Sequence, residues 1–325
     1  MTWLTWRQFR VPVASVFLPV VVVCVFLAVT GADLVHRNDF SDMDAVYGGT
    51  AFLLYALPGV IGVFWGVPLV ARELETGTHN LIWNQSITRT RWLTAKLGVG
   101  VVAAMVVGGL LSAVVSWWAS PIDAAAAEQT DYFSITRMSP VIFGARGIVA
   151  IGYAAFGFVL GVAAGILLRR TVAAMAVTLV AFAAVMVAVP FLVRPYLLPP
   201  VEQSLPITAT AIEGIRGNDS GVIDEIVLHK PAGAWMLGNA TVDPAGTAVA
   251  PLPTSVQDCI PSRDQFPEPG TLIDCVAQLG ELGYTQRITY QPGSRFWPLQ
   301  WMETGLFLVL SGLLTWFCFR RIRHV

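Results

Sequence analysis

The residue types that carry most enzyme chemistry are sparse in this sequence and lie far apart. A metalloprotease would need a His-Glu-x-x-His run, which places two zinc ligands and a base on one helix face, and the sequence contains none. Ser311-Gly312 is the nearest approach to a nucleophilic serine on a glycine turn, but no histidine lies in an apolar segment to act as its base. We therefore expect no catalytic residue and no metal site, and interpret this serine as a helix-packing residue. The histidines are scattered over separate segments: His36, His79, His229 and His324.

A nucleotide-binding site is also absent from the sequence. A P-loop needs a Gly-Lys-Ser/Thr run, because its backbone amides and its lysine together hold the phosphates. The chain has two lysines, of which Lys96 follows Ala95 and Lys230 follows His229. We therefore expect no ATPase site and no bound cofactor in this chain.

The four cysteines fall into two pairs of different character. Cys24 and Cys318 lie in apolar segments and are expected to be buried fillers. Cys259 and Cys275 lie sixteen positions apart in one polar segment. If that segment faces an oxidising compartment, we expect a disulfide that contributes about 3 kcal/mol on a chain-entropy estimate; the alternative is two free thiols.

The elements that carry these residues are mainly membrane spans. Of the 325 residues 55% are hydrophobic and 13% are charged, against about 25% charged in a soluble domain. Windows of about 20 apolar residues predict transmembrane helices, and the first window is too long for a signal peptide. None contains a charged residue or a histidine, which argues against an ion-coupled transporter. Six windows qualify: Val11–Gly31, Ala51–Ala71, Leu97–Trp118, Gly147–Leu168, Thr171–Val193 and the short Thr304–Phe319.

The basic residues predict the orientation of the spans. Placing the N-terminus in the cytoplasm puts most Arg and Lys of the short connecting segments on that side, and nearly all acidic residues on the other. We therefore expect a multi-pass plasma-membrane protein with both termini cytoplasmic. The predicted fold class is an α-helical polytopic membrane protein with six transmembrane helices and a small mixed extracytoplasmic domain between spans 5 and 6. The predicted parts are an interfacial helix at 1–10, spans 1–5 at 11–193, the outer domain at 194–296, and span 6 with a basic tail at 297–325.

The outer segment has local patterns of its own. Residues 221–230 and 286–291 alternate as strands do. Residues 271–282 carry apolar side chains at helical spacing, which predicts a short amphipathic helix. We therefore expect a small mixed domain here and not a linker.

The cytoplasmic segment 72–92 predicts a helix, a break, a short helix, a second break and a further helix. Gly77 is suited to end the first helix, Thr78 to cap the short one, and Thr88 or Ser86 to cap the next span. The short helix would place an apolar patch at the membrane surface, which suits the docking of a cytoplasmic partner; the alternative is an interfacial loop. The expected docking residues are Glu73, Glu75, Thr78, Leu81, Ile82 and Trp83.

Small and aromatic residues in the spans suggest packing and a substrate path. Gly157, Gly161 and Gly165 repeat every four residues, a spacing that lets helix backbones approach; the contact could be intramolecular or a seam between two permeases. Possible path residues are Tyr55 and Tyr153, which could equally be packing aromatics. Glu303 is a third candidate, and its alternatives are to face water or to pair with Arg295.

Two stretches resemble type-2 ABC transporter permeases, notably small actinobacterial-looking ones. The first resembles the intracellular loop of that family and reads Arg72-Glu73-Leu74-Glu75-x-Gly77-Thr78, then Trp83-x-Gln85-Ser86-x-Thr88-Arg89-x-Arg91-Trp92. The second is similar to the start of the sixth span and reads Tyr290-Gln291-Pro292-x-Ser294-Arg295-Phe296-Trp297-Pro298-x-Gln300-Trp301-x-Glu303-Thr304. In that family the loop holds a coupling helix that sits in a cleft of a separately encoded ATPase.

The resemblance implies a permease subunit of an ATP-driven exporter. It implies ATP and magnesium on a partner ATPase dimer, a second permease copy or a paralogue, a lipid bilayer around the spans, and no nucleic acid. The uncharged spans suit an apolar or amphipathic substrate such as a drug, an antibiotic or a lipid-like molecule. One alternative is a membrane sensor or accessory protein whose outer domain binds a ligand. A secondary transporter without buried charges is another.

Overall fold

The computed structural model describes most of the chain, and it divides into two compact units. The helical unit comprises Met1–Ala124, Pro140–Leu197 and Trp297–Val325, and the second unit comprises Ala125–Ser139 and Leu198–Phe296. The described residues are 18, 20–32, 34, 44–78, 88–128, 137–217, 223–257, 259 and 269–323. The predicted interfacial helix at 1–10 therefore lies outside them.

The helical unit contains five helices that are long and apolar enough to cross a membrane. A shorter apolar helix, Val20–Ala32, corresponds to the first predicted span, of which the remaining residues lie largely outside the described part of the chain. Five candidate spans are therefore found among the described residues, where the sequence predicts six. The elements of this unit are α2 (Asp44–Ile61), η1 (Gly62–Gly66), α3 (Val67–Glu75), α5 (Arg89–Trp118), α6 (Ser120–Glu128), α7 (Pro140–Phe143), α8 (Val149–Leu168), α9 (Thr171–Ala188), η2 (Val189–Val193), α10 (Arg194–Leu197) and α13 (Phe296–Ile322).

Several helices extend beyond the predicted apolar windows. The second runs without a break from Ala45 to Glu75, and the last from Gly293 to Ile322. A hydropathy window ends at the first charged residue, whereas a helix can continue past it. The added turns of these two helices contain Glu73 and Glu303, and both carboxylates are paired inside the unit. The segments between the predicted windows at 32–50 and 119–146 are likewise partly helical, since they contain the start of α2 and the short helices α6 and α7.

Two of the long helices contain a π-helical turn, and each turn precedes a proline. Val67 donates its amide to Gly62 in η1, and Arg194 donates to Val189 in η2, so both bonds span five residues. One residue further on lie Pro68 and Pro195. A proline inside a helix lacks the amide proton and its ring clashes with the carbonyl four residues earlier. The wider turn relieves that clash and keeps each helix continuous.

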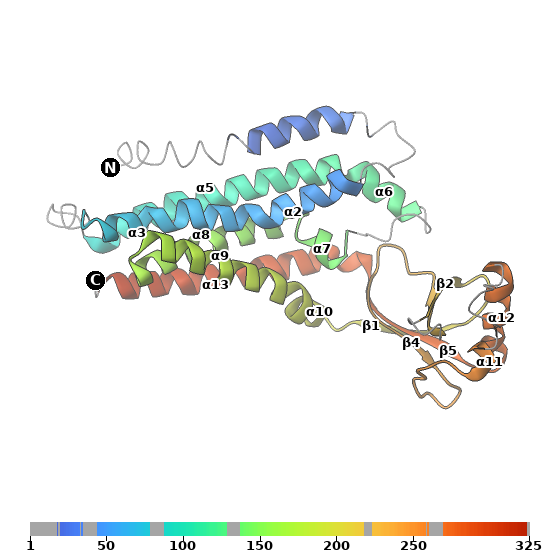
Figure 1. Ribbon diagram of the computed structural model, residues 1–325. Helices are drawn as coiled ribbons and strands as arrows, with labels where there is room; N and C mark the ends of the chain where they lie inside the picture. Colours follow the sequence, from blue (N-terminus) through green and yellow to red (C-terminus); the bar gives the residue numbers. More distant parts are fainter. Residues whose placement is uncertain are drawn as a thin grey trace. The chain divides into compact units, whose positions relative to one another are not determined.

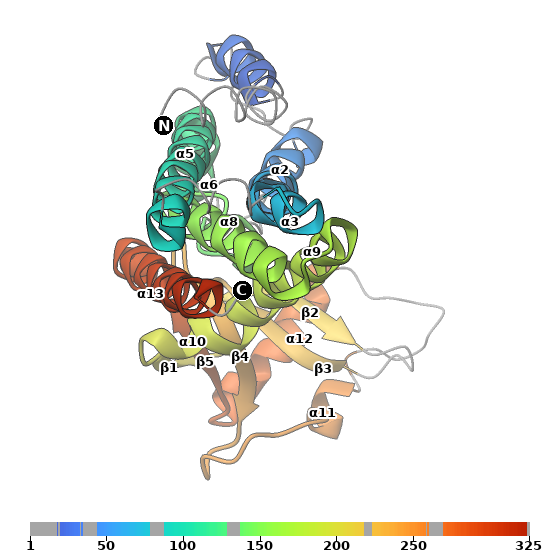
Figure 2. The ribbon, with the colours of Figure 1, turned by 90° about the vertical axis from the view of Figure 1, so that its left-hand side faces the viewer.

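The helix α8 lies in the middle of the helical unit, between α5, the α2–η1–α3 helix and α9 (Figure 2). A Cβ on Gly157 would lie 2.3 Å from the carbonyl oxygen of Pro58, and one on Gly161 would lie 2.1 Å from that of Gly62. Gly165 faces Val67, where the corresponding distance is 3.2 Å. The three glycines thus pack α8 against the α2–η1–α3 helix of the same chain, with backbone touching backbone.

The helix ends form as the sequence predicts. Gly77, after the end of α3, has a φ of +72°, a conformation that glycine adopts without strain. The side chain of Thr88 accepts the amide of Arg91 at 3.3 Å and so caps α5. Arg169 adopts φ +54° and forms a two-residue turn with Arg170 between α8 and α9. Arg89 Nη1 donates to the carbonyl of Arg323, so the start of α5 and the end of α13 lie at one end of the unit (Figure 1).

The second unit is a small α+β domain. Its strands are β1 (Val201–Pro206), β2 (Ile212–Gly217), β3 (Ile223–Leu228), β4 (Trp235–Val242) and β5 (Thr285–Gln291), and its helices include α11 (Thr254–Gln257) and α12 (Pro269–Glu281). Antiparallel pairing gives one sheet of order β1-β5-β4 and a β2-β3 hairpin. The strands predicted at 221–230 and 286–291 and the helix predicted at 271–282 are confirmed.

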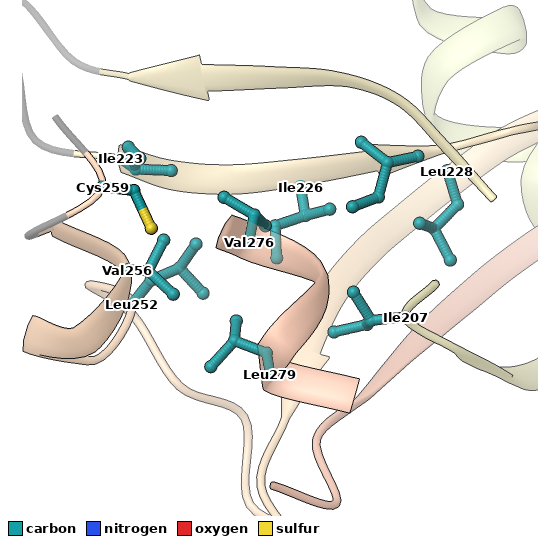
Figure 3. Close-up of a cluster of buried hydrophobic side chains, with 10 residues drawn as sticks. Ile207, Ile223, Ile226, Leu228, Leu252, Val256, Cys259, Val276 and Leu279 are labelled. Atoms are coloured by element: carbon teal, nitrogen blue, oxygen red, sulfur yellow. The ribbon is translucent and has the colours of Figure 1, made fainter. Parts of the chain in front are cut away.

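The second unit has its own apolar core. Ile226, Val276 and Leu279 are at most 1% exposed and pack between the hairpin and α12 (Figure 3). Cys259 borders this core and forms the predicted disulfide with Cys275, with a Cα–Cα distance of 6.0 Å. The larger segment of the second unit begins at Leu198 and not at Arg194, where the sequence predicts the start of the outer domain. Residues 194–197 form α10 and belong to the helical unit.

Candidate functional site

A buried ion pair lies where α10 meets α13 in the helical unit. Arg194 and Glu303 are both 0% exposed. The guanidinium binds the carboxylate with two atoms, since Nε donates to Oε2 at 2.7 Å and Nη2 donates to Oε1 at 3.0 Å. This planar, two-point geometry is the strongest form of an arginine–carboxylate pair.

Two tyrosines complete this site, which we name the Arg194 cluster: Tyr55, Tyr153, Arg194 and Glu303. The hydroxyl of Tyr153, on α8, donates to Glu303 Oε1 and accepts from Arg194 Nη2 at 3.3 Å. The ring of Tyr55, on α2, lies 6.1 Å from that of Tyr153. Both Tyr55 and Arg194 donate to the carbonyl of Pro140, at 3.0 Å and 3.1 Å. The cluster therefore ties together α2, α7, α8, α10 and α13.

The π-turn η2 gives Arg194 its inward direction. One extra residue in a helical turn rotates the following side chains by about 100° relative to a regular helix. Arg194 directly follows η2 and lies with its guanidinium 4.3 Å from the ring of Phe143. A buried charge is tolerated only when its partner and its remaining donors are satisfied, and here carboxylate, hydroxyl and carbonyl oxygens supply the acceptors.

Three side chains of this cluster are singled out by the sequence, as possible path residues, but its cation is not. Tyr55, Tyr153 and Glu303 are the possible path residues of the sequence analysis, and the structure brings all three together. The expectation that Glu303 faces water or pairs with Arg295 is wrong, because Glu303 is bound to Arg194. Arg295 instead donates to Pro199 and Gln291 in the second unit. Sequence reasoning misses Arg194 because this residue lies directly after an apolar window. The one signal that could reveal it is Glu303, an acidic residue at the edge of the last span that needs a cationic partner.

A second group of buried polar contacts holds the turn between α7 and α8. Gln300, on α13, accepts the amide of Val149 at 2.9 Å and donates to the carbonyl of Phe143 at 2.9 Å. Arg146 is 3% exposed, and its Nη1 donates to the carbonyl of Val115 at 2.8 Å. Arg146 and Arg194, which border predicted windows, are thus both turned into the unit. Among the described residues, no group of three or more His, Cys, Asp or Glu side chains could hold a metal ion.

At the opposite end of the unit, the helices that flank the predicted docking loop are held by two carboxylates, which with their partners form the loop stem: Glu73, Glu75, Lys96 and Thr171. Lys96 is 6% exposed. Its Nζ lies 2.6 Å from Glu73 Oε1 and donates to the carbonyl of Leu69 at 2.9 Å. The same ammonium group lies 4.5 Å from the ring centre of Trp92. This pair joins the end of α3 to the first turns of α5.

Glu75 joins the end of α3 to a different helix. Its Oε2 accepts the backbone amide of Thr171 at 3.0 Å and the hydroxyl of the same residue at 2.6 Å. Thr171 is the first residue of α9, whose N-cap residue Arg170 makes no side-chain cap. Glu75 thus satisfies one of the amides that an isolated helix start leaves open, and its negative charge suits the positive end of the helix.

The remaining predicted docking residues lie at the edge of the described chain or beyond it. The hydroxyl of Thr78 lies 3.1 Å from that of Thr76, after the end of α3. Leu81, Ile82 and Trp83 lie outside the described residues.

Comparison with known proteins gives one match. A family model described as "ABC-2 membrane transporter related" matches residues 21–194, more than half of the chain. The matched region contains the loop stem and ends at Arg194. A search of curated proteins and a search of solved structures found no significant match. The match and the five apolar helices agree with the resemblance seen in segment 72–92, and the chain belongs to the ABC-2 membrane transporter related family, that is, it is an ABC-2 type permease.

Proposed function

We propose that this permease is the membrane subunit of an ATP-driven exporter and is driven by a separately encoded ATPase. The ATPase docks on the cytoplasmic loop 72–92. The observation that carries the proposal is the construction of that loop. α3 ends at Glu75, shortly before Gly77, and α5 begins after the capping Thr88, whereas α8 and α9 are joined at the same end by two residues. Only the longer connection offers chain for a docking helix.

We assign contact with the ATPase to Thr78, Leu81, Ile82 and Trp83. Glu73 and Glu75 contribute by holding the loop stem, because their carboxylates are bound to Lys96 and Thr171. A loop whose base is bound to helices on both sides suits an element that must receive a movement and pass it on.

The distribution of arginines supports a cytoplasmic position for the loop. Arg72, Arg89, Arg91, Arg169 and Arg170 belong to the helix ends that meet at the loop stem. At the opposite ends, Arg146 and Arg194 are buried and bound within the unit. Basic residues near span ends face the cytoplasm, so both termini are assigned to that side and the second unit to the outside of the plasma membrane.

The buried charges of the helical unit support an apolar or amphipathic substrate. Arg194 is neutralised by Glu303, and Lys96 by Glu73. A path lined by these helices therefore offers little net charge to a fully ionised solute. The substrate class is a drug, an antibiotic or a lipid-like molecule.

The mechanism follows from two-state behaviour of the membrane subunits. Two permeases, identical or paralogous, pair within the bilayer, and two ATPase subunits dock below them. ATP and magnesium bind to the ATPases, which close and displace the docking loops. A ligand shifts a protein between two states only through a difference in its binding to them, so closure of the ATPases must favour one arrangement of the helices over the other.

The test is purification of the full chain from its native host in mild detergent, with mass spectrometry of bound proteins and an ATP hydrolysis assay. We expect a stoichiometric P-loop ATPase, and we expect its association to be lost with Trp83→Asp. The matched control is Asn84→Asp, which adds the same charge at the next position without removing an apolar side chain. A variant Trp83→Asp that still yields the complete ATPase complex would contradict the proposed docking site.

One observation supports the alternative of a membrane sensor. The second unit has its own apolar core and a disulfide, which suit a separately folded, ligand-binding outer domain. Reproducible purification of the chain without any ATPase, in several detergents, would favour this alternative over the exporter.

A further inference from the structure

The last turn of α3 carries two carboxylates that leave the helix on opposite sides. Each residue turns an α-helix by about 100°, so residues two apart lie about 200° apart around its axis. Glu73 accordingly meets Lys96 on α5, and Glu75 meets Thr171 on α9. The base of the docking loop is therefore attached to helices on both sides.

The two attachments differ in what they reach. α5 directly follows the loop along the chain, so the loop moves it through the backbone as well as through Lys96. α9 begins more than eighty residues after the first residue of α5, and its own first residue, Thr171, binds the carboxylate of Glu75 through both its amide and its hydroxyl. Glu75 thus connects the loop to a helix with which the loop has no direct chain connection.

α9 also reaches the opposite end of the helical unit. With η2 and α10 it forms one continuous helix, Thr171–Leu197. At 1.5 Å per residue, Thr171 and Arg194 lie about 35 Å apart along this helix. Figure 1 shows the run from the start of α9 to α10 along the length of the unit. At its far end Arg194 binds Glu303 on α13 and Tyr153 on α8.

Polar attachments at both ends make this helix different from one held by apolar packing alone. Hydrogen bonds and ion pairs fix direction as well as distance, whereas apolar contact is non-directional. A displacement of the end of α3 therefore moves the start of α9 with a defined direction. Arg194 applies the same displacement to α8 and α13, since its guanidinium is bound to both.

We infer that Glu75 is a positioning residue that couples the docking loop to the Arg194 cluster through α9. The inference rests on the proposed function in taking loop 72–92 as the docking element. ATPase closure moves the loop, Glu75 moves the start of α9, and Arg194 passes the movement to α8 and α13 near the other membrane surface. The movement thus passes along one helix, in which Thr171 is bound to Glu75 near one end and Arg194 is bound to Glu303 near the other.

The experiment is hydrogen exchange with mass spectrometry on the full chain in lipid nanodiscs, without any ATPase. Glu75→Ala removes the acceptor at the start of α9, and the matched control Thr88→Ala removes the acceptor at the start of α5. Both are expected to raise exchange at their own helix start. Only Glu75→Ala is expected to raise exchange, by about threefold, at the distant amides of Gly144, Val149 and Arg194, because loss of a cap loosens the element that it holds.

Coupling between two sites is reciprocal. Glu303→Gln must therefore raise exchange at the amide of Thr171, and Thr88→Ala must not. If Glu75→Ala does not fold, Glu75→Gln, which retains one acceptor oxygen, should show smaller increases with the same distribution. Distant amides that are unchanged in the Glu75 variants, or changed equally by Thr88→Ala, would overturn the inference. Because no ATPase takes part, this result is independent of whether the docking proposal succeeds.

Discussion

Arg194 and Glu303 lie 109 positions apart in the sequence and meet through a two-point ion pair from which solvent is excluded. The pair lies in the helical unit, between α10 and α13, and the chain between those two helices, Leu198–Phe296, forms the larger part of the disulfide-bonded unit. Whatever the second unit does, the chain leaves the helical unit just after Arg194 and returns to it just before Glu303. Within the helical unit, the ion pair therefore joins the two helices between which this long segment of the chain runs.

Removing one member of this pair should be more harmful than removing both. Arg194→Met leaves the carboxylate of Glu303 buried without its partner, and we expect a loss of about 3–5 kcal/mol in the free energy of unfolding. Arg194→Met combined with Glu303→Met should recover much of that loss. Thermal unfolding in detergent, followed by size-exclusion chromatography, measures the order of the three proteins. The exposed pair Arg216–Glu225 provides the control, since Arg216→Met should change stability by less than about 1 kcal/mol. A double variant less stable than both single ones would contradict this account.

The contact between α8 and the α2–η1–α3 helix should not tolerate a methyl group. Gly161→Ala places a Cβ 2.1 Å from the carbonyl oxygen of Gly62, and separating the two backbones should cost about 1–3 kcal/mol or more. Gly312→Ala on α13 is the matched control, because nothing lies within 4 Å of its Cβ position; it should be neutral or stabilise by up to about 1 kcal/mol. Thermal stability of both variants in one detergent makes the comparison. Equal changes in stability in the two variants would show that Gly161 is not needed for the close approach of the two helices.

The amide of Gln300 should be needed for the turn before α8. Gln300→Leu removes the acceptor for Val149 N and the donor for Phe143 O. Each buried group left without a partner costs about 1–3 kcal/mol, so we expect a loss of about 2–6 kcal/mol. Gln203→Leu, at an exposed position of β1, is the control for the same substitution. Hydrogen exchange at the amide of Val149 should be faster in Gln300→Leu only. An unchanged exchange rate in that variant would show that Gln300 does not hold this turn.

The disulfide should stabilise the second unit and leave the helical unit unchanged. The double substitution Cys259→Ser and Cys275→Ser opens a loop of sixteen positions, with an expected loss of about 3 kcal/mol. Limited proteolysis should cleave the chain between Leu198 and Phe296 faster than in the wild type, while fragments of α8 and α13 stay protected. Peptide mapping without reductant should show one linked pair in the wild type. Two free thiols in protein from its native membrane would contradict the prediction.

Five of the six spans and the loop boundaries could be predicted because local sequence decides them. Apolar length, the glycine at 77 and the threonine at 88 act on their own neighbours, and each performs the expected role. The strands and the amphipathic helix of the second unit follow from alternation and from helical spacing. Cys259 and Cys275 paired as expected since no other cysteine lies in that segment.

The candidate site could be predicted only in part because its interactions are between distant residues. Hydropathy treats Arg194, Arg146 and Lys96 as the ends of apolar windows, yet all three side chains are buried and bound. Their partners lie on other helices, and no spacing rule connects residue 194 with residue 303. The extra residue in η2 is likewise invisible to a periodicity of 3.6, although it decides which way Arg194 points.

The π-turn η2 makes the direction of Arg194 depend on how many residues precede it in the helix. Loss of a single residue from this turn would restore regular α-helix and turn the guanidinium by about 100° toward the lipid, where a charge is costly. Many helix ends tolerate the deletion of one residue, but here such a deletion would move the arginine side chain to another face of the helix. Related sequences that lack one residue of η2 should therefore also lack both the arginine and the glutamate. An alignment of the family would show the deletion together with the two replacements.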